Sequence, residues 1–171
     1  MGAPWPASVE RVASFLRESG AEARLEEFPV ETPTAVAAAA AAGCGLDRIV
    51  KSLLVECDGR SVVALVPGDR KGDLDKIAQS VGAQSARVAR PDEVTATTGF
   101  EPGAVAPFPL PGVETVVMER TLLRHPLVWA GGGSPRHLVG LAPGELMRLT
   151  RARPVDAVAP RPYDSDHTKE R

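Results

Sequence analysis

The sequence has few aromatic residues and few cysteines, and both shortages limit what the protein can be. Aromatic residues make up 4% of the 171 residues, so the core must be built from valine, leucine, isoleucine and alanine. The two cysteines, Cys44 and Cys57, fit neither a CxxC motif nor a zinc-ligand spacing. We therefore expect free thiols and a cytoplasmic protein.

The chain also lacks a long apolar run and an excess of charge of either sign. No apolar segment approaches the roughly 20 residues that cross a bilayer, and residues 1–5 carry no features of a secretion signal. Twenty Lys and Arg residues oppose 22 Asp and Glu residues, for a net charge of −2. This balance argues against a protein that coats nucleic acid through bulk positive charge. We expect no membrane partner and no DNA partner.

Several kinds of chemistry have no motif in this chain. There is no GxSxG elbow for a serine nucleophile, and the run Gly131-Gly132-Gly133-Ser134 lacks the Lys-Ser/Thr of a P-loop. None of the three histidines has a metal-ligand companion two to four residues further on. The sequence predicts no metal and no cofactor. An enzyme with this sequence would work by positioning and electrostatics more than through a covalent nucleophile.

Hydrophobic periodicity predicts one domain that mixes helices and strands. Apolar residues at i, i+3, i+4 and i+7 after Ser8 predict a helix that ends at Gly20. Thr32-Pro33 is typical of a helix start, here for the alanine-rich residues 35–42. Asp58-Gly59 predicts a two-residue hairpin turn between strands 49–57 and 61–66. Further strands are expected at 23–29, 85–89, 113–118, 127–130 and 137–141, and further helices after Asp73, at 91–94, at 120–123 and after Pro143.

The order of these elements indicates the fold class and the domain boundary. Regular strand–helix alternation is missing, so we expect an α+β or mixed α/β domain and not a doubly wound sheet. Residues 1–158 should form this single domain. Residues 159–171 are Pro-rich and then highly charged, and we expect them to form a disordered tail.

Lys51 lies in a strand with apolar neighbours on both faces. On the two-residue period it shares a face with Ile49 and Leu53, while Ser52 faces the other way. A lysine in this setting is either a charged edge-strand residue that blocks aggregation or a cation that points into a pocket. The spacing leaves both interpretations open.

The irregular segment 98–112 contains a second candidate, the run Gly103-Ala104-Val105-Ala106-Pro107. Glycine lets a backbone approach a ligand closely, and successive amides in such a loop can hold a carbonyl oxygen. An ordinary Pro/Gly turn explains the run equally simply. Long irregular loops within compact domains are more often functional than neutral.

Taken together, the order and spacing of these segments resemble the YbaK/prolyl-tRNA-editing domain family over residues 8–158. The matching segments are Thr34-Ala35 with the alanine-rich helix and Gly43-Cys44, Ile49–Leu53, Asp73–Ala78 with Gly82-Ala83, Thr98–Pro107 with its GxxxP spacing, Ala130–Gly133, and Leu141–Leu146.

This resemblance implies a fold and an activity. The expected fold is a mostly antiparallel mixed sheet, partly barrel-like and surrounded by helices. The implied activity is that of a trans-acting aminoacyl-tRNA deacylase, which hydrolyses the ester of tRNA mischarged with Ala, Ser, Cys or Thr, with tRNA(Pro) as one expected carrier. The expected partner is aminoacyl-tRNA, with a synthetase or elongation factor as a further one. A non-catalytic module that senses an amino acid or aminoacyl-tRNA is the alternative.

The resemblance also implies roles for individual residues. Lys51 matches the family's essential lysine, and Gly103 and Pro107 match the loop whose backbone holds the aminoacyl group. Some relatives have serine at Ala130 and an acidic residue near His137, so amino-acid specificity does not carry over. The implied substrate-binding residues are Phe28, Thr34, Ser52, Ala130, Gly131, Gly132 and His137.

Contact with tRNA requires basic residues, and the chain has several groups of them. Solvated surface charge explains each group equally well. The groups are Arg70-Lys71, Arg120 with Arg124, Arg136, and Arg148 with Arg151 and Arg153.

Overall fold

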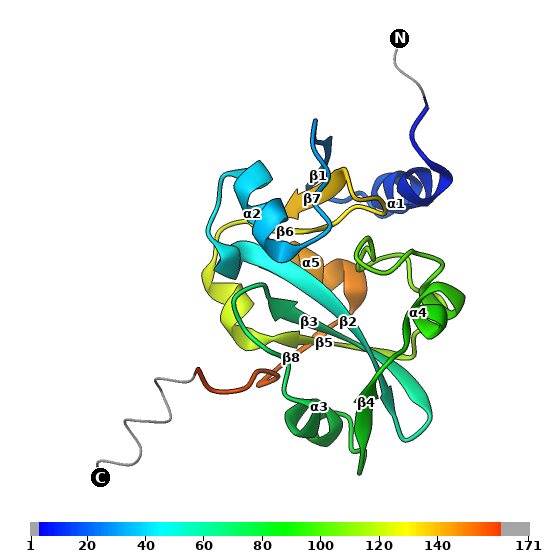
Figure 1. The fold of residues 1–171 in the computed structure, drawn as a ribbon, viewed down its shortest axis with the longest axis vertical. Helices are drawn as coiled ribbons and strands as arrows, with labels where there is room; N and C mark the ends of the chain where they lie inside the picture. The colour runs from blue at the N-terminus through cyan, green and yellow to red at the C-terminus, as the bar shows by residue number, and fades with distance from the viewer. Residues whose placement is uncertain (1–3, 162–171) are drawn as a thin grey trace.

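The computed structural model describes residues 4–161, which form one domain around a mixed sheet (Figure 1). The strands of the described chain are β1 (Ala23–Glu27), β2 (Ile49–Cys57), β3 (Arg60–Pro67), β4 (Ala86–Val88), β5 (Thr115–Glu119), β6 (Val128–Gly131), β7 (His137–Leu141) and β8 (Arg153–Val155). The helices are α1 (Ala7–Glu18), α2 (Ala35–Ala42), α3 (Leu74–Ser80), α4 (Pro91–Thr98) and α5 (Pro143–Thr150), with short 3-10 helices η1 (Leu46–Arg48) and η2 (Arg120–Arg124). Within residues 4–161, none of the helices is long and apolar enough to span a bilayer.

The strand order confirms the predicted fold class. The sheet runs β1-β7-β6-β2-β3-β5-β8, and β4 pairs with β2. The pairs β1–β7, β7–β6, β2–β3 and β2–β4 are antiparallel, whereas β2–β6, β3–β5 and β5–β8 are parallel. The sheet is open, with β1 and β8 at its ends, and the helices lie around it.

The predicted hairpin between β2 and β3 is confirmed. Asp58 and Gly59 both have positive φ, 51° and 80°, which is the turn geometry that matches the twist of two antiparallel strands. The register pairs Cys57 with Arg60 at the turn and Val50 with Pro67 at the other end. This long hairpin therefore places the start of β2, where Lys51 lies, far from the turn.

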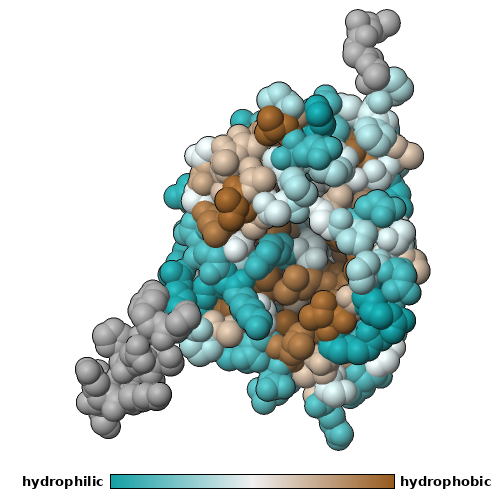
Figure 2. All heavy atoms as spheres, in the orientation of Figure 1, coloured by the Kyte–Doolittle hydropathy of each residue, from teal (hydrophilic) through white to brown (hydrophobic). Residues whose placement is uncertain are grey.

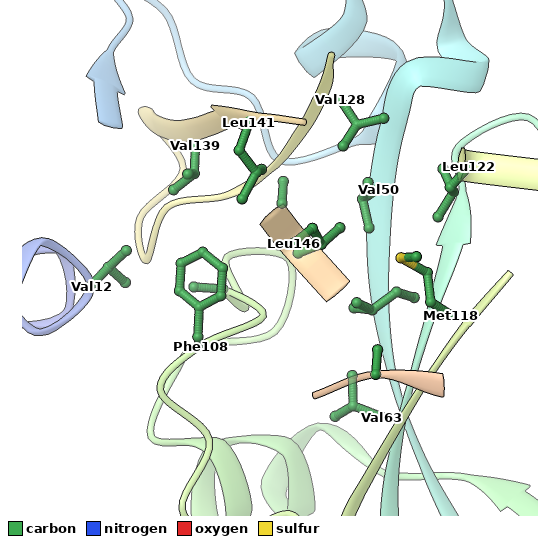
Figure 3. Close-up of a cluster of buried hydrophobic side chains, with 14 of the residues drawn as sticks. Val12, Val50, Val63, Phe108, Met118, Leu122, Val128, Val139, Leu141 and Leu146 are labelled. Carbon is green, nitrogen blue, oxygen red and sulfur yellow. The ribbon is translucent and has the colours of Figure 1, made fainter. Parts of the chain in front are cut away.

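Apolar side chains pack on both faces of the sheet. Along β3, Val63 and Leu65 belong to one buried cluster, and Val62, Ala64 and Val66 belong to another. In the first cluster, Phe108 and Leu146 lie among aliphatic side chains from the sheet and from α1 (Figure 3). The core is thus built mainly from aliphatic residues, as the scarcity of aromatics predicts.

Two predicted helix caps are wrong, because the hydroxyls form longer-range bonds. α1 begins at Ala7 after Pro6, and the Ser8 hydroxyl donates to the Gly133 carbonyl at 2.7 Å. α2 is capped by Thr34, whose hydroxyl accepts from the Ala37 N–H at 3.1 Å. The Thr32 hydroxyl instead donates to the Pro135 carbonyl at 2.8 Å. The hydroxyls of Ser8 and Thr32 therefore bind two N-terminal segments to the turn between β6 and β7.

The end of the described chain also departs from the expectation. Strand β8 pairs with β5 and was not predicted from the sequence. Beyond it, the Ala159 N–H donates to the Lys71 carbonyl at 2.8 Å, so the chain is still bound to the domain past the expected boundary at residue 158. Residues 162–171, most of the expected tail, lie outside the described residues.

Candidate active site

A cavity of about 340 Å³ opens where the start of α2, the first half of β2, the loop before β5 and the β6–β7 hairpin meet. On the face shown in Figure 2, apolar side chains gather over α2, where Val36 is 68% exposed. The cavity is lined by Thr32, Pro33, Thr34, Ala35, Ala38, Ile49, Val50, Lys51, Ser52, Leu53, Gly103, Val105, Trp129, Ala130, Gly131, Ser134, His137 and Leu138.

Lys51 lies in the cavity wall on a strand that is paired on both sides. β2 lies between β6 and β3, but its ladder with β6 ends at Val50, and among the described residues Lys51 itself pairs only with Val66 of β3. Its place in the cavity wall favours the interpretation as a cation that points into a pocket. Its ammonium donates to the backbone carbonyl of Arg70 at 2.8 Å. Burial lowers the pKa of Lys51 below its usual value. The negative charge of Asp69 raises this pKa, but by less than burial lowers it. Since an ammonium has three N–H donors, Lys51 can offer two more to a ligand.

The loop around Gly103 forms another wall, and two glycines allow its close approach. Gly103 has φ +82°, in the region that favours glycine. A Cβ on Gly131 would lie 2.4 Å from the Val105 carbonyl oxygen, so only glycine lets this loop pack against the end of β6. Pro107 is placed elsewhere, in a separate groove with Phe15 and Leu149.

Two buried polar atoms of the cavity residues have no hydrogen-bond partner within residues 4–161: Ser52 Oγ and His137 Nε2. His137 is 2% exposed, and its Nδ1 lies 2.5 Å from the Ser134 hydroxyl. Trp5 packs edge-on against its ring at 5.2 Å between centroids. Burial lowers the pKa of His137, against a smaller raising effect of the Glu27 charge. Buried polar atoms are nearly always bonded to protein or to ordered water, so these two atoms are the polar groups near the cavity that the protein itself leaves without a partner within residues 4–161.

The structure brings most of the predicted site residues to this cavity and leaves three outside. Lys51, Gly103, Thr34, Ser52, Ala130, Gly131 and His137 line it. The Phe28 ring instead packs edge-on against Trp129, with 6.0 Å between centroids. Gly132 lies in the β6–β7 turn and donates its N–H to the His137 carbonyl at 2.8 Å. Together with Pro107, these two are not among the lining residues.

Sequence reasoning missed Trp129 as a cavity residue, and it named Val105 and Ser134 only as members of the runs 103–107 and 131–134. For Trp129 a signal exists in the hairpin register, which pairs it with Gly140. A Cβ at Gly140 would lie 2.9 Å from the indole ring, so the glycine makes room for the tryptophan. For Val105 the sequence indicates the run 103–107 but not which of its residues lines the cavity, because that depends on how the irregular loop packs.

Several of the basic residues considered for tRNA contact are engaged in bonds to the domain itself. The Arg136 guanidinium bonds to the Pro29 carbonyl at 3.3 Å and is next in sequence to the cavity residue His137. The others with such bonds are Arg70 to Ala159, Arg148 to Glu145 and Arg153 to Ser80. Of the basic groups considered for tRNA contact, Arg136 is thus the one whose neighbour in sequence, His137, lines the cavity.

Comparison with known proteins identifies similar domains. A family model described as an aminoacyl-tRNA editing domain matches residues 30–149. The chain is 34% identical over 144 residues to the uncharacterized protein YwhH of Bacillus subtilis (strain 168), covering 84% of this chain and 91% of YwhH. It is 39% identical over 105 residues to the proline–tRNA ligase of Nitratidesulfovibrio vulgaris (strain DP4), covering 60% of this chain but only 18% of the ligase.

The structural comparison agrees. The crystal structure of a candidate trans-editing enzyme for prolyl tRNA synthetase superimposes with a TM-score of 0.85 and 35% identity. The match covers 92% of this chain and all of that one. The similarity thus extends over nearly the whole described domain, cavity included.

Proposed function

This chain belongs to the aminoacyl-tRNA editing domain family, and from that premise we propose that it is an aminoacyl-tRNA deacylase that hydrolyses mischarged tRNA in trans. The similarity to a candidate trans-editing enzyme over its full length supports action in trans. The segment shared with a proline–tRNA ligase supports tRNA(Pro) as carrier and a prolyl-tRNA synthetase as partner. A cytoplasmic location stays a prediction.

The observation that carries the proposal is the pairing of Lys51 with the Gly103 loop in the walls of one cavity. An aminoacyl ester is already activated, so holding its carbonyl and placing a water beside it can supply much of the catalysis. The water oxygen bonds to the carbonyl carbon, the bond to the ribose oxygen breaks, and the ribose hydroxyl regains a proton. Backbone groups of the loop hold the aminoacyl carbonyl. The two remaining N–H groups of Lys51 bind the terminal-adenosine phosphate or the developing negative charge.

The cavity also supports a choice among substrates. Its volume of about 340 Å³ admits the small side chains of Ala, Ser, Cys and Thr and does not by itself exclude larger ones. Volume alone separates such side chains weakly, by about 1–3 kcal/mol per methylene. Ser52 Oγ and His137 Nε2 can each bond to a polar group of the substrate. The methyl side chain of an alanyl ester offers no such group, so only the amino group of that ester could bond to them. We therefore expect seryl and threonyl esters to be hydrolysed faster than alanyl esters.

The hydrogen-bond role of His137 depends on its tautomer. The Ser134 hydroxyl accepts the Arg136 N–H at 3.0 Å and lies 2.5 Å from His137 Nδ1, to which it can donate its own proton when that nitrogen carries none. A neutral imidazole with Nδ1 as acceptor carries its proton on Nε2. His137 would then donate to a substrate oxygen, which suits a side-chain hydroxyl.

A single-turnover deacylation panel tests the proposal. It uses tRNA(Pro) charged with Ala, Ser, Cys or Thr, and compares wild type with Lys51→Ala and with the charge-matched control Arg60→Ala, at the far end of the hairpin. We expect hydrolysis that depends on Lys51 and is fastest for Ser or Thr. A non-catalytic sensing module would instead bind these substrates without turnover by the wild-type protein, and that result would remove the deacylase proposal.

A further inference from the structure

Residues 156–161, which we call the C-terminal strap, pair with the β3–α3 loop, residues 68–73. The Asp73 N–H donates to the Ala157 carbonyl at 2.8 Å, and Gly72 and Val158 form an antiparallel bridge. The Ala159 N–H donates to the Lys71 carbonyl at 2.8 Å. Successive residues of the strap therefore hold successive residues of the loop through the backbone.

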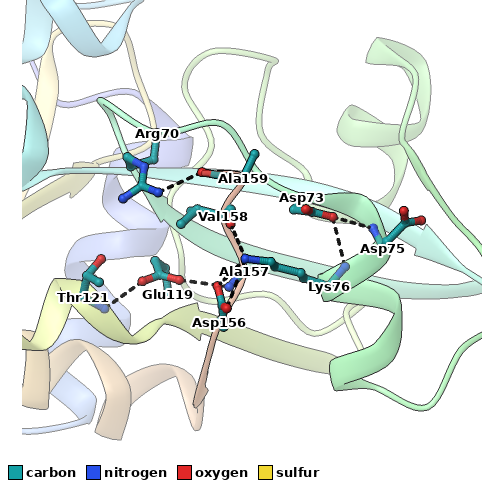
Figure 4. Close-up of polar contacts among 10 residues, drawn as sticks. All are labelled: Arg70, Asp73, Asp75, Lys76, Glu119, Thr121, Asp156, Ala157, Val158 and Ala159. Carbon is teal, nitrogen blue, oxygen red and sulfur yellow. Dashed lines mark hydrogen bonds and ion pairs between the residues drawn. The ribbon is translucent and has the colours of Figure 1, made fainter. Parts of the chain in front are cut away.

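Charged side chains reinforce this pairing from both sides, as Figure 4 shows for most of them. Hydrogen bonds that involve a charged group are stronger than neutral ones, so they favour a single arrangement of loop and strap. The contacts are Arg70 to the Ala159 carbonyl at 2.8 Å, Lys76 to the Val158 carbonyl at 2.9 Å and to Asp156 at 3.1 Å, and Arg161 to Asp69 at 2.5 Å.

Glu119 fixes the beginning of the strap to the sheet. Its side chain is 1% exposed, at the end of β5, and accepts the Ala157 N–H at 2.9 Å through one carboxylate oxygen. The other oxygen accepts the Thr121 N–H at 2.9 Å. Both bonds go to backbone donors, so the carboxylate serves to hold chain segments in place (Figure 4).

The loop held in this way contains the groups that act on Lys51. The Arg70 carbonyl accepts the Lys51 ammonium at 2.8 Å, and Asp69 is the charged residue whose field acts on it. His137 is the other titratable residue that lines the cavity. The next contact outward from Asp69 is Arg161 of the strap. Arg161 of the strap is thus bonded to Asp69, whose neighbour in the chain, Arg70, accepts the hydrogen bond of the cavity residue Lys51.

We propose that the C-terminal strap positions Lys51, by holding the β3–α3 loop so that the Arg70 carbonyl binds the ammonium in one geometry. Arg161 and Asp69 are then positioning residues, which act through the loop. This inference rests on the proposed function for the importance of Lys51 to turnover, but the placement of the ammonium can be tested without turnover.

The test uses the full-length protein with Arg161→Met, and Arg60→Met as matched control. Arg60 also donates to a backbone carbonyl, that of Val81 at 3.1 Å, but at the turn of the β2–β3 hairpin. We expect Arg161→Met to lower kcat about tenfold with little change in KM, because a misplaced catalytic group costs rate more than binding. Arg60→Met should retain the wild-type kcat and KM.

A second measurement follows Lys51 in the absence of substrate. The chain has four lysines, so the ¹³Cε resonance of Lys51 can be assigned through Lys51→Arg and titrated by NMR. In Asp69→Asn we expect Lys51 to titrate at lower pH, because the negative charge that raises its pKa is gone. The amide oxygen of the asparagine can still accept the hydrogen bond from Arg161. In Arg161→Met we expect a shifted Lys51 resonance, which a merely stabilising strap would not produce.

The outcomes separate the two proposals. Wild-type kcat in Arg161→Met, with Lys51→Ala inactive, would overturn the positioning role. If the wild-type protein does not deacylate any substrate, the proposed function fails and the NMR measurement decides alone. An unchanged Lys51 resonance in Arg161→Met then overturns the inference, and a shifted one supports it. Thermal melting of each variant ensures that the folded protein is compared.

Discussion

The Lys51 ammonium donates its hydrogen bond to the backbone carbonyl of Arg70, 19 residues further along the chain, at 2.8 Å. A backbone acceptor leaves the lysine charge without a direct carboxylate partner at that bond. The negative charge of Asp69 acts on it through its field. This arrangement holds the ammonium in place while leaving it able to attract an anionic part of a substrate.

Replacing Lys51 by alanine should reduce single-turnover deacylation by at least about a hundredfold, the usual cost of removing one donor from a developing negative charge. The fold should persist, because the substitution removes a single side-chain hydrogen bond, and water can replace the ammonium at the Arg70 carbonyl. Circular dichroism and melting temperature check the fold. Wild-type turnover in the variant would exclude Lys51 from the reaction.

Gly131→Ala should destabilise the protein and displace the Gly103 loop. The new Cβ would lie 2.4 Å from the Val105 carbonyl oxygen, and overpacking of this kind costs about 1–3 kcal/mol. Urea unfolding measures the change in the free energy of unfolding. Gly144→Ala is the control, because its Cβ would meet nothing within 4 Å and it lies in helix α5. If both variants unfold at the same urea concentration, the close approach at Gly131 is unimportant.

Local patterns predicted the central hairpin and most helices, because these depend on neighbours in sequence. The Asp58-Gly59 turn, the Asp73 cap and the Gly43 helix end all form as expected. β8 was missed, since three residues with one proline carry no clear period. Its place depends on pairing with β5, a contact between segments distant in the chain.

The candidate site was predictable where the family resemblance supplied residues on regular strands. Lys51, Ser52 and His137 lie on β2 and β7, and the sheet brings them to one cavity. Pro107 and Phe28 lie outside it, since the paths of an irregular loop and of the segment after β1 depend on tertiary packing. The hydroxyls of Ser8 and Thr32 fit local caps in sequence, but they bond to the β6–β7 turn instead.

Gly103→Ala should lower kcat/KM about tenfold, because a non-glycine residue at φ +82° costs about 1–3 kcal/mol and the loop would relax away. Space is not the cause, since the added Cβ would lie 3.5 Å from the Pro33 carbonyl oxygen. Gly59→Ala carries the same backbone strain, at φ +80°, in the distant hairpin turn. If Gly103→Ala and Gly59→Ala show equal deacylation kinetics, the Gly103 segment is an ordinary turn without a role in the reaction.

Stability should rise with pH between the folded-state pKa of His137 and its usual value of 6.5. Burial lowers the pKa in the folded protein, so in this window the unfolded chain binds the proton more readily and acid favours unfolding. Melting temperatures of wild type and His137→Gln between about pH 5 and 7.5 measure the effect. The variant should show a flatter profile, and parallel profiles would contradict a buried neutral imidazole.

Ser52→Ala should narrow the preference for seryl and threonyl over alanyl esters, by about tenfold if the hydroxyl bonds to the substrate. The melting temperature should not fall, because the buried Ser52 hydroxyl has no partner to lose among residues 4–161. Ser61→Ala is the control, since that hydroxyl bonds to Glu56 at 3.1 Å near the hairpin turn. Single-turnover rates with seryl-, threonyl- and alanyl-tRNA give the ratios. If the ratio of seryl and threonyl to alanyl rates is unchanged in Ser52→Ala, the side-chain hydroxyl of the substrate does not depend on Ser52, and His137 Nε2 is the remaining candidate partner. His137→Gln should then remove the preference for seryl and threonyl esters.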